Sequence, residues 1–330
     1  MSRTDPGPSA AHRRPHVGSL EALTAGLLLL LLGQRWIATL FDGHPALQSF
    51  ATIFVAICVQ AMPFLVLGVL VSAAIATFVP AAFWTRALPS NAALAVPVAA
   101  SAGALLPGCE CASVPIAGGL VARGVAPSSA LAFLLSAPAI NPVVLVATSV
   151  AFPGRPVMVL ARFLGSLVTA VSVGWLWARF GKADWLKPSP RPDLSRLGRI
   201  DGFRTSMQHD FLTAGGYLVV GGLTAAALNV LVPRSWLQAV AGHAVFSVLF
   251  LAGLAVVLAI CSEADAFVAA SLSQFSLTSR LAFLVVGPTV DVKLIAMQAG
   301  AFGRSFALRF APLTFVVAIA VSGVIGAWLL

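Results

Sequence analysis

The sequence has 330 residues, of which 59% are hydrophobic and 9% are charged, whereas about a quarter of an ordinary soluble domain is charged. Its mean hydropathy is +0.97 and its net charge is +9. This composition excludes a soluble enzyme, a disordered protein and a nucleic-acid-binding protein, and 4 cysteines do not make a disulfide scaffold. It predicts an all-α polytopic protein of the cell membrane with about 7–9 transmembrane helices, whose basic excess is typical of cytoplasmic loops.

Apolar runs and polar stretches divide the chain into four parts. Residues 1–19 form a polar, Pro-rich tail that we expect to be disordered. Residues 20–180 hold an extra helix followed by a first membrane repeat, residues 181–209 form a polar central loop, and residues 210–330 form a second repeat. Because Lys and Arg concentrate in the tail and the central loop, both are predicted to be cytoplasmic.

The repeat is visible as shared anchors in the two halves. Leu131–Asn141 matches Leu281–Asp291 at a spacing of 150, and the same spacing places Cys111 on Cys261. Each unit contains a segment broken by small and polar residues, 91–125 in the first half and 240–277 in the second. The loop charges favour a hairpin that enters and leaves on one side over a crossing. An odd number of crossings per unit then inverts the second repeat, as is common among transporters.

The first broken segment contains two thiols that flank a carboxylate. It reads Pro107-Gly108-Cys109-Glu110-Cys111, with Pro115 shortly after, and the second segment has Cys261, Glu263 and Asp265 at the matching place. Proline and glycine free backbone groups, which inside a membrane must face protein or a cavity. A carboxylate there indicates a functional site. The alternative is that cysteine serves as a small apolar residue, which is the better interpretation for Cys58.

A second signature follows each broken segment. Pro138, Asn141 and Pro142 interrupt an apolar helix in the first half, and Pro288, Asp291 and Lys293 do so in the second. Either these are structural kinks, or they are two half-helix ends that point at one central site. Lys293 is predicted to meet an acid from elsewhere, with Glu263 or Asp265 as candidates. Such a set is a static ion pair or a proton carrier, and the sequence leaves this open.

Three further basic residues were assigned to the membrane–water interface. Arg162 and Arg309 lie near the start of the last helix of each unit, where a long side chain can reach the headgroup layer. His243 opens the second broken segment and is also expected there.

The stretch from Pro107 to Leu145 resembles the predicted-permease family that includes the ArsP-type organoarsenical efflux permeases and YraQ-like proteins. The shared pattern is Cys109 and Cys111, Pro115, Arg123 with Gly124, and Ala132 through Pro142. A later run from Cys261 to Leu294 looks like the second-half signature, so the resemblance covers roughly residues 48–330. Glu110 departs from the small or polar residue that is frequent between the cysteines. The resemblance implies efflux, and more weakly an arsenical substrate.

The sequence contains no phosphate-binding loop for ATP, so transport by this chain would be secondary, channel-like or driven by a partner. Thiolates favour soft ions and thiophilic metalloids, which makes Cys109 and Cys111 candidate metal ligands. The expected substrate-binding residues are Cys109, Glu110, Cys111, Asn141 and Cys261, and the expected coupling or ion-pair residues are Glu263, Asp265, Asp291 and Lys293. We expect no cofactor, no nucleic-acid partner and a small-molecule or ion substrate; a protein partner is unspecified. The alternatives are an intramembrane thiol oxidoreductase and a membrane assembly factor without substrate.

Overall fold

The computed structural model describes residues 45–80, 83, 88–89, 91–106, 108–187, 198–231 and 244–330. All regular elements within these ranges are helical. The chain divides after Ser49, and the residues from Phe50 to Leu330 form one compact unit, which the following sections concern. The tail, the extra helix, Pro107 and His243 lie outside the described residues.

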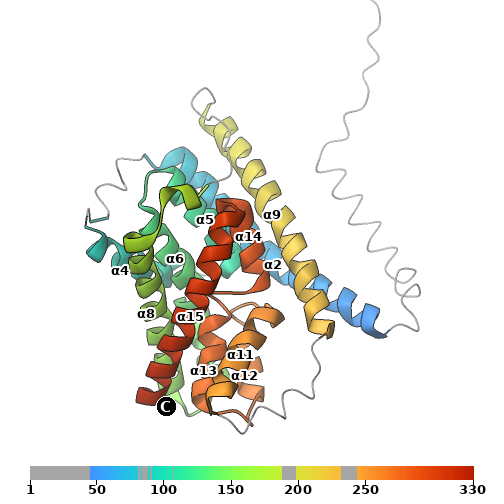
Figure 1. Ribbon diagram of the computed structural model, residues 1–330. Helices are drawn as coiled ribbons and strands as arrows, with labels where there is room; N and C mark the ends of the chain where they lie inside the picture. The colour runs from blue at the N-terminus through green and yellow to red at the C-terminus, as the bar shows by residue number, and fades with distance from the viewer. Residues whose placement is uncertain are drawn as a thin grey trace, which may run out of the picture. The chain divides into compact units, whose positions relative to one another are not determined.

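Among the described residues, both halves show the same succession of long and short helices (Figure 1). The first half has a long helix, two short helices, a pair that meets end to end and a last long helix: α2 (Pro45–Phe78), α4 (Ala92–Ala102), α5 (Glu110–Ala122), α6 (Pro127–Ile140), α7 (Pro142–Ala151) and α8 (Pro156–Phe180). The second half follows with α9 (Arg199–Leu231), α11 (Ala244–Leu258), α12 (Asp265–Ser271), α13 (Leu277–Val286), α14 (Val292–Phe302) and α15 (Arg304–Leu329). Two single 3₁₀ turns are η1 (Gly103–Leu105) and η2 (Ala183–Trp185).

Five spans among the described residues are long and apolar enough to cross a membrane: α2, α8, α9, α15 and the joined α6–α7 pair. The polar segment between the halves differs from the expected loop, because α9 already begins at Arg199. Its first turns bury small or hydrogen-bonding residues at every fourth position, namely Gly202, Ser206 and Asp210, which gives a polar stretch a helical packing face. Asp210 accepts a hydrogen bond from the Ser72 hydroxyl of α2 at 2.6 Å.

Helices α4 and α5 run antiparallel on the surface of α6. A Cβ on Gly103 would lie 2.2 Å from the Ser136 hydroxyl, so the chain after α4 lies beside the end of α6. The Asn141 amide donates to the Gly108 carbonyl at 3.0 Å, which also places the start of α5 there. A short turn joins the end of α5 to the start of α6. Residues 91–122 therefore run toward the end of α6 in α4 and back toward the start of α6 in α5.

The second half has the same arrangement around α13. A Cβ on Gly287, at the end of α13, would lie 3.9 Å from Ala255 of α11 and 3.8 Å from the Asp265 carboxylate. The end of α11 and the start of α12 therefore both lie beside the end of α13. At the other end of α13, Arg280 donates to the carbonyls of Phe275 and Ser273, which follow α12.

The last helices of the two halves, α8 and α15, run in opposite directions. Trp177 near the end of α8 packs edge-on against Phe306 and Phe310 near the start of α15, with ring centroids 5.1 and 5.7 Å apart. The backbone N–H of Lys187 then donates to the Phe302 carbonyl at 2.9 Å, which fastens the chain after α8 to the α14–α15 junction.

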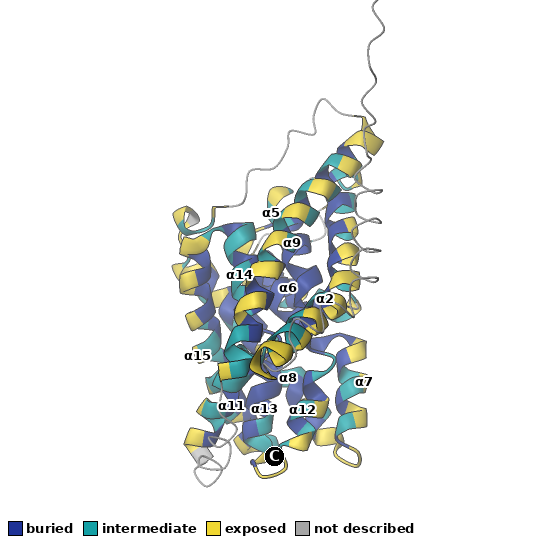
Figure 2. Ribbon diagram, turned by 90° about the vertical axis from the view of Figure 1, so that its right-hand side faces the viewer, coloured by how far each residue is buried: buried dark blue, intermediate teal, exposed yellow. Residues whose placement is uncertain are grey.

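Burial separates central helices from outer ones (Figure 2). From Ser128 to Ile140 every residue of α6 is buried, and α13 is buried from Leu281 to Val286. In contrast α2 and α9 bury mostly small residues and expose large apolar ones such as Val59 and Leu212. A helix that is apolar all round with a buried small-residue face is typical of a helix that contacts lipid.

Candidate functional site

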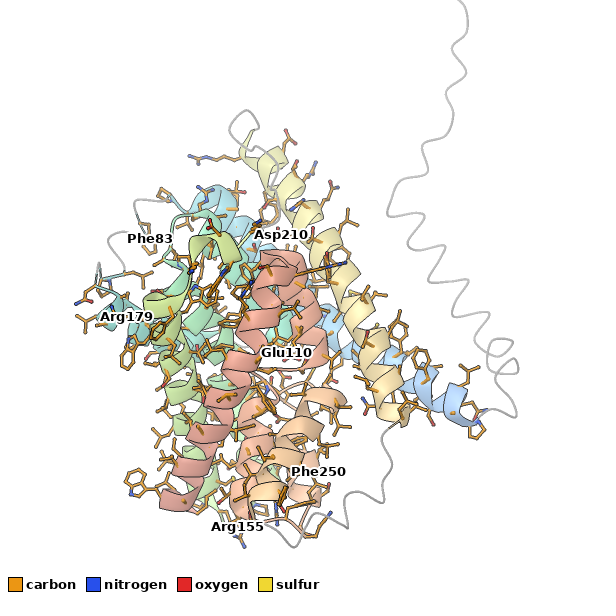
Figure 3. All side chains as sticks on the ribbon, viewed as in Figure 1. Phe83, Glu110, Arg155, Arg179, Asp210 and Phe250 are labelled. Carbon is orange, nitrogen blue, oxygen red and sulfur yellow. The ribbon has the colours of Figure 1, made fainter. Side chains whose placement is uncertain are left out.

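Four helix breaks meet at one place inside the unit. They are residues 108–109 before α5, Asn141 between α6 and α7, residues 259–264 before α12, and residues 287–291 before α14. The Asn141 amide donates to both Gly108 and Ala137 carbonyls at 3.0 Å, which satisfies backbone groups that the breaks expose. In Figure 3, Glu110 lies between the end that carries Asp210 and the end that carries Arg155. The breaks therefore bring backbone and polar side chains to the interior.

Two of the breaks end in matching helix caps. Asn141 accepts a hydrogen bond from the Val144 N–H at 3.0 Å, and Asp291 accepts one from the Leu294 N–H at 2.5 Å. These side chains thus start α7 and α14 in the same way.

The prolines of the signatures fall into two groups. Pro142 is the first residue of α7 and Pro288 lies between α13 and α14, next to the breaks. Pro115 and Pro138 were expected to break helices, but they lie inside α5 and α6. A proline removes one backbone hydrogen bond, and both helices are buried on nearly every side, so packing holds them continuous.

Three buried thiols from both halves lie together. Cys109, Cys111 and Cys261 belong to one buried cluster, in which the Cys109 thiol is near enough to interact with the other two. One ligand atom from each of Cys109, Glu110 and Cys111 lies within 4.8 Å of the others. All four cysteines are free, and Cys58 on α2 is only half-buried. A set of two or three sulfurs beside a carboxylate suits a soft or borderline cation or a thiophilic metalloid.

The first buried ion pair joins Glu110 to Lys293. The Lys293 ammonium lies 2.5 Å from the Glu110 carboxylate and 3.9 Å from that of Asp291, and all three side chains are fully buried. It also lies 3.7 Å from the Cys261 sulfur and 3.4 Å from the Ala259 carbonyl. The expectation that Lys293 pairs with Glu263 or Asp265 was wrong, because α14 packs against α5 of the other half.

The second buried ion pair joins Arg162 of α8 to Asp265 of α12 at 2.8 Å. The guanidinium also donates to the Thr148 hydroxyl at 2.8 Å and the Ser262 carbonyl at 3.1 Å. The expectation that Arg162 reaches the interface was therefore wrong, since its side chain is fully buried. Arg309, by contrast, is exposed and lies over the Trp185 ring at 4.9 Å.

Both ion pairs cross from one half of the chain to the other, and in each the acid is the first residue of a short helix. Thr148 and Arg162 are the residues that sequence reasoning missed. Depth in the helix gave no signal, because Arg309 lies almost as far into α15 as Arg162 lies into α8 and is exposed.

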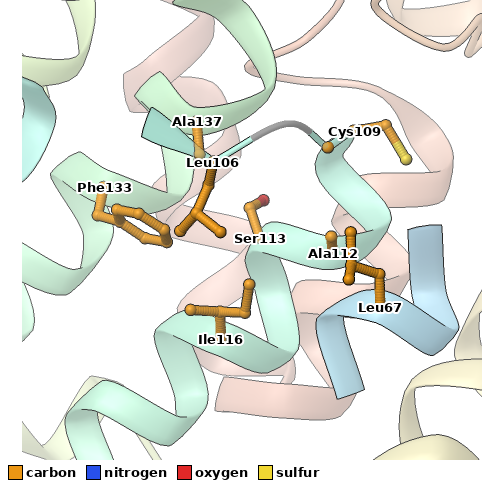
Figure 4. Close-up of a pocket in the computed structure, with 9 residues that line it drawn as sticks. Leu67, Leu106, Cys109, Ala112, Ser113, Ile116, Phe133 and Ala137 are labelled. Carbon is orange, nitrogen blue, oxygen red and sulfur yellow. The ribbon is translucent and has the colours of Figure 1, made fainter. Parts of the chain in front are cut away.

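A small apolar pocket lies beside the thiols (Figure 4). Leu106, Ile116, Phe133 and Ala137 line it together with Cys109. Leu67 of α2 also lines it and is 39% exposed, so the pocket lies between the thiols and the outer face of α2.

The long apolar helices and the buried polar centre define a helical membrane protein. The family described as "Predicted permease" (ArsP_1) matches residues 46–327. The UPF0718 protein YcgR of Bacillus subtilis is 39% identical over 281 residues, which cover 82% of this chain and 94% of that protein. A Streptococcus mutans protein, named as a subunit of a two-component membrane permease complex, is 32% identical over 288 residues, 85% and 95% of the two chains.

The chain belongs to this family of predicted permeases, which confirms the resemblance seen in the sequence. No solved structure matches it. The family and the apolar helices together support a membrane permease.

Proposed function

We propose that the chain is a secondary permease that exports a soft metal or metalloid species, with trivalent organoarsenicals among the candidates. The observation that carries this proposal is the cluster of Cys109, Cys111 and Cys261, three buried thiols from both halves. A thiol cluster in the interior of a permease offers a soft cargo a site halfway along its path. The family resemblance to arsenical exporters supports the direction.

We further propose an inverted repeat with two re-entrant hairpins, α4–α5 and α11–α12. Three observations support it. Both halves show the same succession of long and short helices, residues 91–122 turn back on themselves, and α8 and α15 run in opposite directions. In such an architecture the hairpin tips meet near the bilayer midplane, where transporters hold their substrates. The loop charges support a location in the cell membrane with the N-terminus and the central segment on the cytoplasmic side.

Glu263, Asp265, Asp291 and Lys293 are proposed to carry the coupling ion. Lys293 lies 3.7 Å from the Cys261 sulfur and 3.9 Å from the Asp291 carboxylate, so cargo and coupling charge can occupy neighbouring positions. Because one relative is named as a subunit of a two-component complex, a second membrane protein is a candidate partner.

The decisive experiment measures export from inside-out vesicles that contain the full chain. Cys109→Ser and Cys111→Ser should abolish thiol-dependent export of Cd²⁺ or a trivalent arsenical, because serine keeps the size but lacks the soft sulfur. Cys58→Ser is the matched control and should export normally. Full transport by the Cys109→Ser/Cys111→Ser double variant would contradict the proposal, and reversible formation of a disulfide during turnover would favour the thiol oxidoreductase.

A further inference from the structure

We propose that the cargo enters the site as a cation, and that Glu263 is the residue whose charge selects for it. This inference rests on the proposed function, and it narrows "soft metal or metalloid" to metal cations over neutral or anionic metalloid species. It follows from the charges, the unpartnered atoms and the engaged donors of the buried site.

The site contains more acids than bases among the described residues. Glu110, Glu263, Asp265 and Asp291 supply four carboxyl groups, whereas Arg162 and Lys293 supply two cations. Each cation has one acid at 2.5–2.8 Å. A buried charge without a partner is strongly unfavourable, so the remaining acids need protons or a positively charged occupant.

The unpartnered buried atoms point the same way. Among the charged groups of the site they are almost all carboxylate oxygens: both oxygens of Glu263, Oδ1 of Asp265, Oδ2 of Asp291 and both oxygens of Glu110, the last with an ion pair but no hydrogen bond. The single unpartnered donor on these groups is Nε of Arg162. Oxygens of this kind attract a cation and repel an anion.

Most of the groups that would hold an anion are already engaged, although Nε of Arg162 and the Ser262 hydroxyl have no hydrogen-bond partner. The terminal nitrogens of Arg162 donate to Thr148, Ser262 and Asp265. The start of α7 is capped by Asn141 and that of α14 by Asp291, so two helix starts that would otherwise attract an anion carry side-chain caps, one of them negative. An oxyanion in the site would therefore face more unpartnered carboxylate oxygens than unpartnered donors.

Glu263 is the acid of the site for which no ion pair is seen among the described residues. It lies in the break before α12, its two oxygens are buried, and no other described residue donates to them. It lies two residues after Cys261 and two before Asp265, whose carboxylate pairs with Arg162. Glu110, Asp265 and Asp291 each have a cation or a helix start; Glu263 has neither.

The test measures binding to the purified full-length protein with two probes, Cd²⁺ and phenylarsine oxide, a neutral trivalent arsenical. Glu263→Gln should weaken Cd²⁺ binding by about tenfold or more and leave the arsenical unchanged, because a buried charge acts on a cation and not on a neutral ligand. Glu263→Asp keeps the charge and should retain most of the Cd²⁺ affinity. Asp201→Asn, on the exposed face of α9, is the control and should change neither.

Equal losses for both probes, or no loss for Cd²⁺ with Glu263→Gln, would overturn the inference. A failure of Glu263→Gln to fold is answered by Glu263→Asp, whose Cd²⁺ affinity must then stay near that of the unaltered protein. A failure of the proposed function can be told apart from a failure of this inference. If Cd²⁺ binding survives in the Cys109→Ser/Cys111→Ser variant but still depends on Glu263, the thiols are not the cargo ligands, whereas the preference for a cation stands.

Discussion

The Lys293 ammonium lies 2.5 Å from the Glu110 carboxylate, and this contact fastens the start of α14 to the start of α5 from the opposite half. Both side chains have no exposure, and Glu110 stands between the two thiols of the first half. A buried pair of this kind is worth little against an apolar replacement of the same shape, but breaking it by removing one partner is expensive. Its role is therefore to hold two helices in one register.

Replacing Lys293 with Met should lower the free energy of unfolding by about 3–5 kcal/mol, because Glu110 is left buried without its cation. The double variant Glu110→Gln/Lys293→Met should recover most of that loss. The measurement is thermal unfolding in detergent, followed by size-exclusion chromatography. Lys187→Met, at an exposed position, is the control and should unfold as the unaltered protein does. If the double variant is no more stable than Lys293→Met, the unpaired Glu110 carboxylate is not the cause of the loss, and the prediction is wrong.

The Arg162–Asp265 pair supports an equivalent prediction. Arg162→Met should destabilise the protein by about 3–5 kcal/mol, since Asp265 and the Ser262 carbonyl both lose their donor. Arg309→Met should cost less than about 1 kcal/mol, because Arg309 is exposed and its ring contact is solvated. Comparable stability of the two variants would mean that Arg162 is not buried as described.

Close approach of α2 to the thiol helix gives a prediction about Gly68. A Cβ at this position would lie 2.4 Å from the Ala112 Cα and 2.7 Å from its carbonyl oxygen, so α2 or α5 must move. Gly68→Ala should destabilise the protein by about 1–3 kcal/mol and weaken Cd²⁺ binding, because Ala112 adjoins Cys111. Gly216→Ala is the matched control in a transmembrane helix; with nothing within 4 Å of the new Cβ, it should be neutral or slightly stabilising. Unchanged binding by Gly68→Ala would show that α5 tolerates displacement.

Local chemistry in the sequence was enough to locate the breaks and their polar residues. Glycine and proline around Cys109, and the Asn141 and Asp291 positions, mark where a helix cannot continue or where a new one is capped, and these are properties of a few neighbouring residues. The thiols could be placed in one site only by assuming that the halves face each other.

The partners of the buried charges were beyond sequence reasoning. Arg162 looks the same in the sequence whether it reaches lipid headgroups or an acid. Only the fold, which brings the Asp265 carboxylate of α12 to the Arg162 guanidinium of α8, decides between them. Similarly, Lys293 pairs with Glu110 because α14 lies against α5, a contact between residues far apart in the chain. The sequence did not predict that α9 begins as early as Arg199. Its buried face there is made of Gly202, Ser206 and Asp210, residues that composition alone assigns to a loop.

Asp291 allows the cap and the charge of one residue to be separated. Its carboxylate accepts from the Leu294 N–H, as the Asn141 amide oxygen does from the Val144 N–H in the first half. Asp291→Asn should therefore keep α14 intact, since asparagine caps a helix as well as aspartate, whereas Asp291→Ala should cost about 0.5–2 kcal/mol. Thermal unfolding of the two variants measures the cap.

Transport by the same variants measures the charge. If Asp291 carries the coupling ion, Asp291→Asn should bind Cd²⁺ and exchange it passively across vesicles but lose its response to an imposed pH gradient. Asp291→Ala should show the same loss of response on top of its lower stability, because both variants lack the carboxylate. An unchanged rate and an unchanged pH response in Asp291→Asn would leave Asp291 as a helix cap that stands next to Lys293, and would shift the coupling role to Glu263 or Asp265.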